Sequence, residues 1–169
     1  SAWGTAMAHA GLGVALIGVV CETTWNSEYI ATMKPDQVAK VAGYELKLDG
    51  LTQRQGPNYR ETLAQFSVSL DGQPMPAMTP SKRSFTTRGM STTEAALLTR
   101  GASQLYVSLG DASSDGGIAV RIYYKPLVLL IWWGPVLMAF GGVLSLSDRR
   151  LRVGAPKPAR ASRGLQAAE

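Results

Sequence analysis

The chain has 169 residues, of which 46% are hydrophobic and only 17% are charged, and its formal net charge is +5. This length allows one ordinary domain with accessory segments, so it excludes a multidomain enzyme. The low charged fraction is unusual for a soluble globular surface, and it arises from two apolar blocks, one near each end of the chain.

The first apolar block predicts a transmembrane helix over residues 1–21. It has no charged side chain, and at about 1.5 Å of rise per residue it covers about the 30 Å of a bilayer core. The single cysteine of the chain, Cys21, closes the block and is interpreted as a helix-packing residue. Lipidation is disfavoured, because a branched valine precedes Cys21 and no basic segment precedes the block.

The only histidine of the chain, His9, lies inside this first block. An ionisable side chain at membrane depth indicates a functional site, and neutral imidazole is a common ligand of haem iron. Small residues surround His9 and allow a neighbouring helix, or a flat macrocycle, to approach closely. The alternative is that His9 only hydrogen-bonds to a neighbouring helix. One histidine fills one axial position of an iron, so a second ligand must come from elsewhere.

Residues 22–124 change to short alternating segments with turn residues between them, which predicts a small all-β domain. We expect an antiparallel barrel or sandwich of about six to eight strands. The stretch from Thr92 to Leu98 is the one with helical features, because Ser91 and Glu94 match a capping box, and a loop is the alternative. The expected strands are residues 29–33, 38–41, 44–51, 62–70, 105–109 and 118–124.

The predicted β-domain contains no catalytic constellation, since it has no histidine, no cysteine and no pair of carboxylates at helical spacing. An interaction module is therefore favoured over an enzyme domain. The segment Gly56-Pro57-Asn58-Tyr59 is interpreted as a rigid turn carrying an aromatic ring, and part of a partner surface is the alternative.

The second apolar block predicts a transmembrane helix over residues 125–147. Trp132 and Trp133 are interpreted as packing residues, with contacts to a cofactor or to lipid as the alternative. The better candidates for an aromatic belt at the membrane interface are Tyr123 and Tyr124, at the start of this block.

A basic tail, residues 148–169, follows the second block. It carries six basic and two acidic residues, so four of the five net positive charges of the chain lie there. Basic residues directly after a transmembrane helix indicate a cytoplasmic C-terminus, which places residues 22–124 in the periplasm. The positive charge is therefore an orientation signal and not a nucleic-acid site. The Pro, Ala and Arg-rich composition predicts disorder in the tail.

The chain begins at Ser1, already within a turn of the first predicted span and without a methionine or a polar leading segment. We therefore expect a C-terminal fragment of a larger polytopic membrane protein.

Taken in order, the motifs of the sequence are similar to the C-terminal part of CcmF, the haem lyase component of the bacterial cytochrome c maturation system. The resemblance extends over nearly the whole chain and ends at about residue 158. The motifs that carry it are Trp3-Gly4, Ala8-His9, Gly43-Tyr44, Gly56-Pro57-Asn58-Tyr59, Thr93-Glu94-Ala95-Ala96, Leu105-Tyr106, Leu109-Gly110-Asp111, Val120-Arg121-Ile122-Tyr123-Tyr124-Lys125-Pro126 and Leu146-Ser147-Asp148-Arg149-Arg150.

The resemblance implies a multi-pass protein of the bacterial inner membrane, with a periplasmic domain between its last two spans. It also implies that His9 is one axial ligand of the iron of a haem b, whose second histidine lies on an earlier helix outside this chain. That haem is expected to pass electrons, from quinol, to the haem carried by the chaperone CcmE. Ferrous haem then forms thioether bonds with the cysteines of apocytochrome c.

The tryptophan-rich haem-handling segment of the family does not occur in this chain, so no catalytic residue is assigned and the fragment alone is not expected to ligate haem. Its expected partners are the rest of CcmF, a CcmH-type subunit, CcmE, apocytochrome c and membrane lipids. The alternative function is a non-catalytic scaffold, in which two membrane anchors present the β-domain for protein docking and His9 is a packed, hydrogen-bonding residue.

Overall fold

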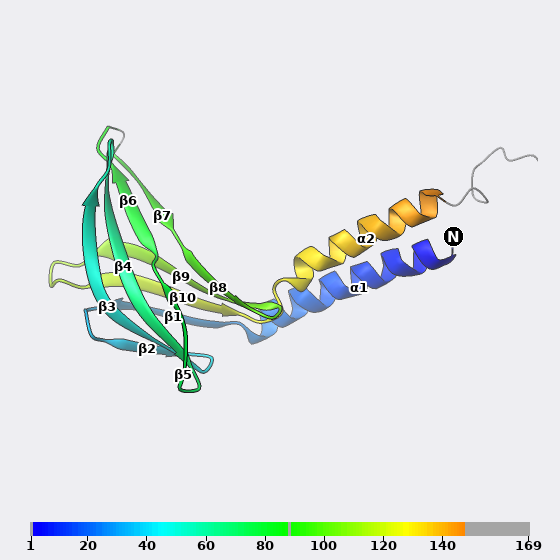
Figure 1. Cartoon of the computed structure of the whole chain (residues 1–169), viewed down its shortest axis with the longest axis horizontal. Helices are drawn as coiled ribbons and strands as arrows, with labels where there is room; N and C mark the ends of the chain where they lie inside the picture. Colours follow the sequence, from blue (N-terminus) through cyan, green and yellow to red (C-terminus); the bar gives the residue numbers. More distant parts are fainter. Residues whose placement is uncertain (1, 88, 148–169) are drawn as a thin grey trace, which may run out of the picture.

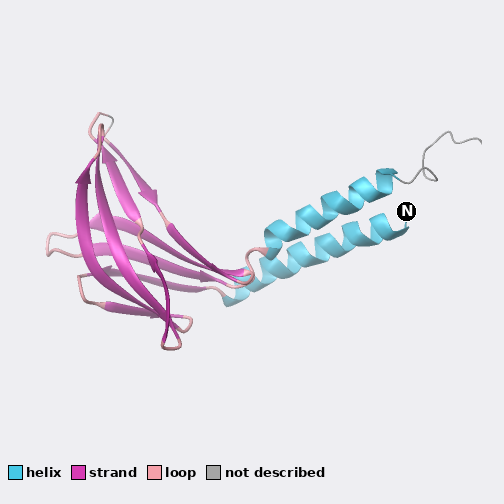
Figure 2. Ribbon diagram, in the orientation of Figure 1, coloured by secondary structure: helices cyan, strands magenta, loops and turns pink. Residues whose placement is uncertain are grey.

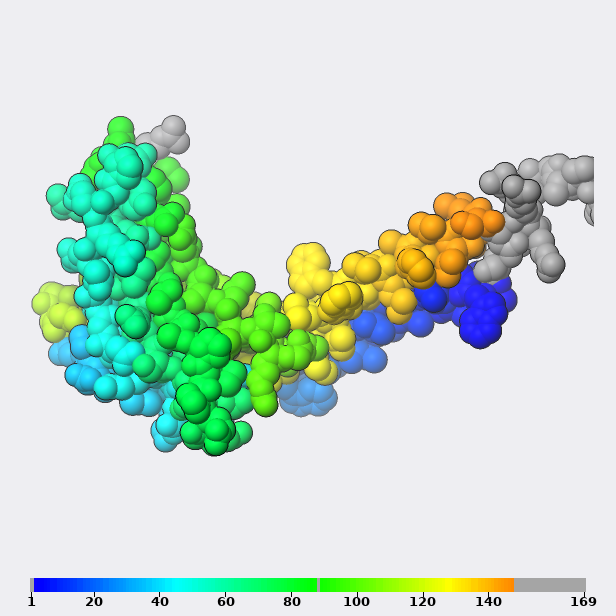
Figure 3. Space-filling view, viewed as in Figure 1, coloured from blue at the N-terminus to red at the C-terminus, as the bar shows by residue number. Residues whose placement is uncertain are grey.

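The computed structural model describes residues 2–87 and 89–147. A helix at each end of this part of the chain flanks a β-domain, and the two helices lie side by side and project from one end of it (Figure 1, Figure 2). In the space-filling view the helix pair is a narrow stalk beside the broader β-domain (Figure 3). The helices are α1 (Ala2–Trp25) and α2 (Leu130–Ser147).

The β-domain has ten strands within the described residues, and they form two antiparallel sheets. One sheet has the order β1-β10-β9-β8. The other has the order β2-β3-β4-β6-β7, with β5 also paired to β4. The strands are β1 (Ser27–Met33), β2 (Val38–Val41), β3 (Tyr44–Gln55), β4 (Tyr59–Leu70), β5 (Gln73–Met78), β6 (Ser81–Phe85), β7 (Met90–Glu94), β8 (Ala96–Arg100), β9 (Ser103–Ala112) and β10 (Ile118–Lys125).

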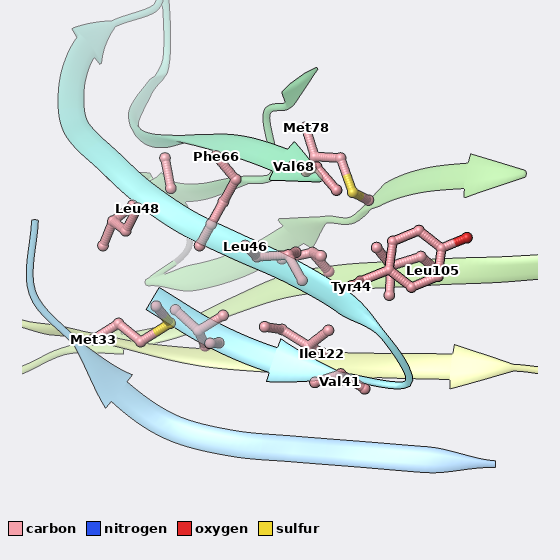
Figure 4. Close-up of a cluster of buried hydrophobic side chains, with 14 of the residues drawn as sticks. Met33, Val41, Tyr44, Leu46, Leu48, Phe66, Val68, Met78, Leu105 and Ile122 are labelled. Carbon is pink, nitrogen blue, oxygen red and sulfur yellow. The ribbon is translucent and has the colours of Figure 1, made fainter. Parts of the chain in front are cut away.

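The core of the domain lies between the inner faces of the two sheets (Figure 4). Strand β4 shows how the sequence specifies it: Ala64, Phe66 and Val68 are buried, and the residues between them are exposed. From the other sheet, Leu105 and Ile122 are completely buried against this face. Alternation of apolar and polar residues is the pattern of a strand with one buried face, and the predicted strand at residues 62–70 is confirmed.

The helical alternative for Thr92 to Leu98 is wrong, because this stretch ends β7 and begins β8. Glu94 forms an ion pair with Arg83 of β6 and does not cap a helix. Every residue of β7 is exposed, so no apolar alternation marks the strand in the sequence. The same cause explains the low expected number of strands: β6 and β7 are mostly polar, and β5 contains two prolines, which occur in sheets at edges and bulges.

The helices also differ in extent from the predicted blocks. Helix α1 continues past Cys21 to Trp25, and α2 starts at Leu130 because Lys125 still belongs to β10. The turn before α2 is tied to the β8–β9 turn by hydrogen bonds from the Leu129 N–H to the Ala102 carbonyl (3.0 Å) and from the Leu127 N–H to the Ser103 hydroxyl (3.0 Å). These bonds fix the start of α2 against the β-domain.

The two helices are antiparallel and touch through their backbones. Three glycines of α1, spaced seven residues apart, are buried in the contact: Gly4, Gly11 and Gly18. A Cβ atom on Gly11 would lie 2.6 Å from the carbonyl oxygen of Gly134, and one on Gly4 would lie 2.7 Å from that of Gly141. Small residues at such spacing allow this close approach. Cys21 is buried at the same contact, in agreement with a packing role.

The glycine contact gives a prediction with a matched control in adjacent residues. A Cβ on Gly141 would lie 2.7 Å from the Ala8 backbone nitrogen, whereas a Cβ on Gly142 would meet nothing within 4 Å. We expect Gly141→Ala to lower the free energy of unfolding by roughly 1–3 kcal/mol, because backbone atoms cannot move aside. Gly142→Ala should be neutral or stabilising by up to about 1 kcal/mol, since alanine favours helix. Thermal unfolding in detergent measures both, and equal melting temperatures would contradict the contact.

The turn between β9 and β10 is held by a carboxylate. Asp115 forms an ion pair with Lys34 (2.9 Å), and the Ser113 N–H bonds to the Gly117 carbonyl (2.8 Å). Hydrogen bonds from the Ser113 side chain, from Lys34 and from the Gly117 N–H lower the pKa of Asp115 from 3.8 to about 2. The carboxylate therefore ties this turn to the end of β1.

Because folding lowers the pKa of Asp115, its contribution to stability is complete above the unfolded pKa of 3.8 and is lost as the pH falls toward about 2. The melting temperature of the wild-type protein should fall over this pH range, and Asp115→Asn should flatten the decline. Both side chains of the pair are about half exposed, so we expect a small effect. Thermal unfolding between about pH 5 and pH 2 checks this, with Asp71→Asn in the β4–β5 turn as the control. Parallel curves for wild type and Asp115→Asn would refute it.

Candidate functional site

His9 lies on the face of α1 that points away from α2. The buried glycines Gly4 and Gly11 mark the contact with α2, and at about 100° per residue His9 is about 150° around the helix from their line. Its side chain is accordingly exposed in the described chain. The imidazole is therefore presented to whatever covers the outer face of α1.

The backbone one turn earlier fixes the tautomer of His9. Its Nδ1 lies 2.8 Å from the carbonyl oxygen of Thr5, and because a carbonyl only accepts hydrogen bonds, Nδ1 must carry the proton. The lone pair of the neutral ring is then on Nε2, at the outer edge of the imidazole. A hydrogen bond that protonates one ring nitrogen and leaves the other to bind metal is the usual arrangement of histidine ligands. Sequence reasoning missed this role of Thr5, whose only sequence signal is its i−4 spacing from His9.

The surface around His9 combines small residues with two exposed leucines, Leu12 and Leu16, which follow it by three and seven residues. Ala6 and Ala10 flank it, and Gly13 follows one turn later on the same side of α1. A Cβ atom on Gly13 would meet nothing within 4 Å, so contact with α2 does not explain this glycine. The helix thus presents one imidazole on a face of small and leucine side chains.

The described residues offer one candidate ligand and no complete metal site. Among the described residues, no group of three or more histidine, cysteine or carboxylate side chains is placed to hold a metal ion. A haem iron needs only one or two axial protein ligands, because the macrocycle provides the other four, so the residues present fit one side of a haem. By helical rise, His9 is about 10 Å from the Ala2 end of α1 and about 24 Å from the Trp25 end.

Three exposed tryptophans lie at the end of the helix pair that adjoins the β-domain. Trp25, Trp132 and Trp133 are 64%, 70% and 61% exposed. Tyr124, one of the two tyrosines expected in an aromatic belt, is partly buried against the domain core, with its ring 5.9 Å from that of Tyr44. Packing within the chain does not account for the two tryptophans of α2, so their alternative role in lipid or cofactor contact is favoured.

The second surface with unusual chemistry is a cluster on β4, β6 and β7. The carboxylate of Glu61 is buried and accepts hydrogen bonds from the Ser81 hydroxyl (2.9 Å) and from Arg83 Nε (3.0 Å). These bonds, that from Ser81 first, lower the pKa of Glu61. Arg83 also pairs with Glu94 and lies 4.9 Å from the centroid of the Tyr59 ring. Each member has a partner within the cluster, so its chemistry is structural.

The cluster also explains the Gly56-Pro57-Asn58-Tyr59 motif. The Gly56 N–H bonds to the Tyr59 carbonyl (2.9 Å), and the Tyr59 ring lies so close to Gly56 that a Cβ there would be 2.5 Å from Cζ. The interpretation of the motif as a rigid turn is confirmed. His9 therefore stands as the candidate ligand, and the cluster on the β-domain is structural.

Comparison with known proteins identifies the β-domain. Residues 24–126 match the family model described as the CcmF C-terminal beta-sandwich. The chain is 82% identical, over its full length, to the cytochrome c-type biogenesis protein CycK of Bradyrhizobium diazoefficiens, of which it covers 26%. It is 39% identical over 152 residues, 90% of its length, to CcmF of Haemophilus influenzae, of which it covers 24%.

The fold agrees with a solved structure. That of a cytochrome c haem lyase CcmF superposes with a TM-score of 0.70 at 15% sequence identity, over 85% of this chain and 24% of that one. The chain thus spans about a quarter of the length of the relatives that it matches. The family match covers the β-domain, and the alignment with CycK of Bradyrhizobium diazoefficiens also includes both helices of this chain. The chain belongs to the CcmF family of cytochrome c biogenesis proteins and corresponds to its C-terminal part.

Proposed function

We propose that this chain is the C-terminal portion of a cytochrome c haem lyase, in which His9 supplies one axial ligand to a membrane-bound haem b. The observation that carries the proposal is the placement of His9: it faces away from α2, its Nδ1 is bound to the Thr5 carbonyl, and Nε2 is left to coordinate iron. The membership in the CcmF family supports a role in haem attachment. A haem bound here would supply one-electron chemistry.

In this proposal the chain crosses the bacterial inner membrane twice, through the apolar parts of α1 and α2. Residues 22–124 are periplasmic, and the basic tail, 148–169, which lies outside the described residues, is cytoplasmic. Both helices are long and apolar enough to cross a membrane. Most of their apolar side chains are exposed in the described chain, which is favourable only against lipid or other helices. The exposed tryptophans at the β-domain end match an interfacial belt.

The orientation of α1 supports a position for the proposed haem. Because Gly4, Gly11 and Gly18 are occupied by α2, the haem lies on the opposite face, between α1 and helices of the protein outside this chain. Gly13, one turn from His9, leaves room for the edge of the macrocycle or for a helix beside it. The second axial ligand belongs to one of those helices.

The haem is proposed to receive electrons from quinol and to keep the iron of the haem carried by CcmE in the ferrous state. Ferrous haem is then attached to the cysteine thiols of apocytochrome c. The β-domain contributes a periplasmic docking surface for partners such as a CcmH-type subunit. The rest of CcmF supplies the haem-handling segment, so the chain alone is not a complete enzyme.

The second candidate is a scaffold without a cofactor. The same hydrogen bond favours it, since the Thr5 carbonyl satisfies one nitrogen of His9 within the helix. In this case the two helices only anchor the β-domain for docking, and a bound haem would not depend on His9.

Replacement of His9 separates the two candidates. In the full-length protein, His9→Ala should abolish the reduced-minus-oxidised absorbance of haem b, because the iron loses an axial ligand. Membrane insertion should be unchanged, since removing a polar group does not weaken a spanning helix. Val143→Ala, which shortens an exposed side chain of α2, is the control and should keep the spectrum. A wild-type spectrum for His9→Ala would establish the scaffold.

Substitution of two glycines tests which face of α1 binds the proposed haem. Gly13 and Gly142 both face open space in the described chain, but only Gly13 is on the His9 face of α1. We expect Gly13→Leu to remove most of the bound haem b, because the new side chain fills the proposed haem surface. Gly142→Leu should retain it. The haem-to-protein ratio of the purified full-length variants is the measurement, and full haem content in Gly13→Leu would contradict the assigned face.

A further inference from the structure

A cleft lies where the last turn of α1 meets the outer face of the four-stranded sheet, and its volume is about 420 Å³. The residues that line it come from four elements of the chain. The charged ones are Glu22 of α1, Glu28 of β1, and Arg121 and Lys125 of β10. Two aromatic residues, Tyr106 of β9 and Tyr123 of β10, also line the cleft.

The strand register explains why these side chains share one face. Glu28 pairs with Tyr123, and Tyr123 pairs with Tyr106, so the three form a row across the sheet. Arg121 and Lys125 are two residues to either side of Tyr123 and therefore project from the same face. The tyrosine rings meet edge to face at 5.8 Å, and the Lys125 ammonium lies 5.7 Å from the centroid of the Tyr106 ring. The tyrosines form the floor of the cleft.

The charges of the cleft have no ion-pair partners within the part of the chain that the structure describes. The ion pairs of the β-domain join other residues, for example Lys34 to Asp115 and Lys40 to Glu45. Two carboxylates and two cations thus share one cleft without neutralising each other. Such a site is complementary to a ligand that itself carries one positive and one negative group.

The cleft also has a definite position relative to the membrane, and this step rests on the proposed function. Glu22 directly follows the apolar block of α1, and the exposed Trp25 is in the same last turn. Tryptophan at the end of a spanning helix lies at the level of the lipid headgroups. The cleft therefore opens toward the headgroup layer on the β-domain side of the bilayer.

We propose that this cleft binds the headgroup of phosphatidylethanolamine. Lys125 and Arg121 bind the phosphate, and Glu22 and Glu28 accept hydrogen bonds from the primary ammonium. An ammonium carries three donors, so it bonds to carboxylates in a way that a trimethylated headgroup cannot. The acyl chains extend along α1 past Val19, which lies one turn before Glu22 and is exposed.

The test is native mass spectrometry of the delipidated full-length protein, titrated with defined lipids in detergent. Phosphatidylethanolamine should bind about tenfold more tightly than phosphatidylcholine, which keeps the phosphate and loses the donors. In Glu22→Gln/Glu28→Gln this preference should disappear. In Arg121→Gln/Lys125→Gln the affinity for phosphatidylethanolamine and for phosphatidylglycerol should fall about tenfold.

The control is Arg54→Gln/Arg60→Gln, which removes two cations of β3 and β4 that lie outside the cleft and should keep wild-type lipid binding. Thermal unfolding of each variant confirms that it folds. The proposal is overturned if the wild type binds both zwitterionic lipids equally, if it prefers phosphatidylglycerol, or if the cation variant binds like wild type. The haem spectrum of His9→Ala is read separately, so failure of the haem assignment and failure of the lipid site give different results.

Discussion

The backbone contact between α1 and α2 determines most of what this chain presents to its surroundings. Glycines at Gly4 and Gly11 meet Gly141 and Gly134 so closely that no Cβ fits between the helices. This contact fixes the rotation of α1 and thereby directs His9 away from α2. The helix pair is joined directly to the β-domain, because α1 leads into β1 and α2 follows β10. All of β1 is paired with β10. The helix pair and the β1–β10 strand pair therefore form one continuous unit.

The sequence predicted the helices and strands whose buried residues form a recognisable apolar pattern along the chain. The alternation around Phe66 marked β4, the apolar blocks marked both helices, and the resemblance to CcmF named the family that the comparison confirms. Strands β5 to β8 were missed because their residues make few core contacts: β7 is wholly exposed, and prolines interrupt β5. Their pairing is set by neighbouring strands, through interactions such as that of Arg83 with Glu61, which local sequence does not encode.

The candidate site could also be predicted only in part from the sequence. His9 could be chosen as a candidate ligand from the sequence, because a polar residue in an apolar block is a local anomaly. The face on which it lies could not, since every turn of α1 contains small residues and only pairing with α2 distinguishes Gly11 from Gly13. The cleft that Glu22 and Arg121 line could not be predicted from the sequence for a similar reason. These residues are 99 positions apart, and only the β1–β10 pairing brings them together.

The distance between His9 and the β-domain separates two contributions of the chain. Thirteen helical steps, about 20 Å, separate His9 from Glu22, and α1 continues to Trp25 before β1 begins at Ser27. No side chain of the β-domain reaches across that length, so the β-domain of this chain would not contribute a ligand to a haem bound at His9. The glycine contact fixes α1 against α2, and because both helices lead directly into the β-domain, it also fixes the direction of His9 relative to that domain.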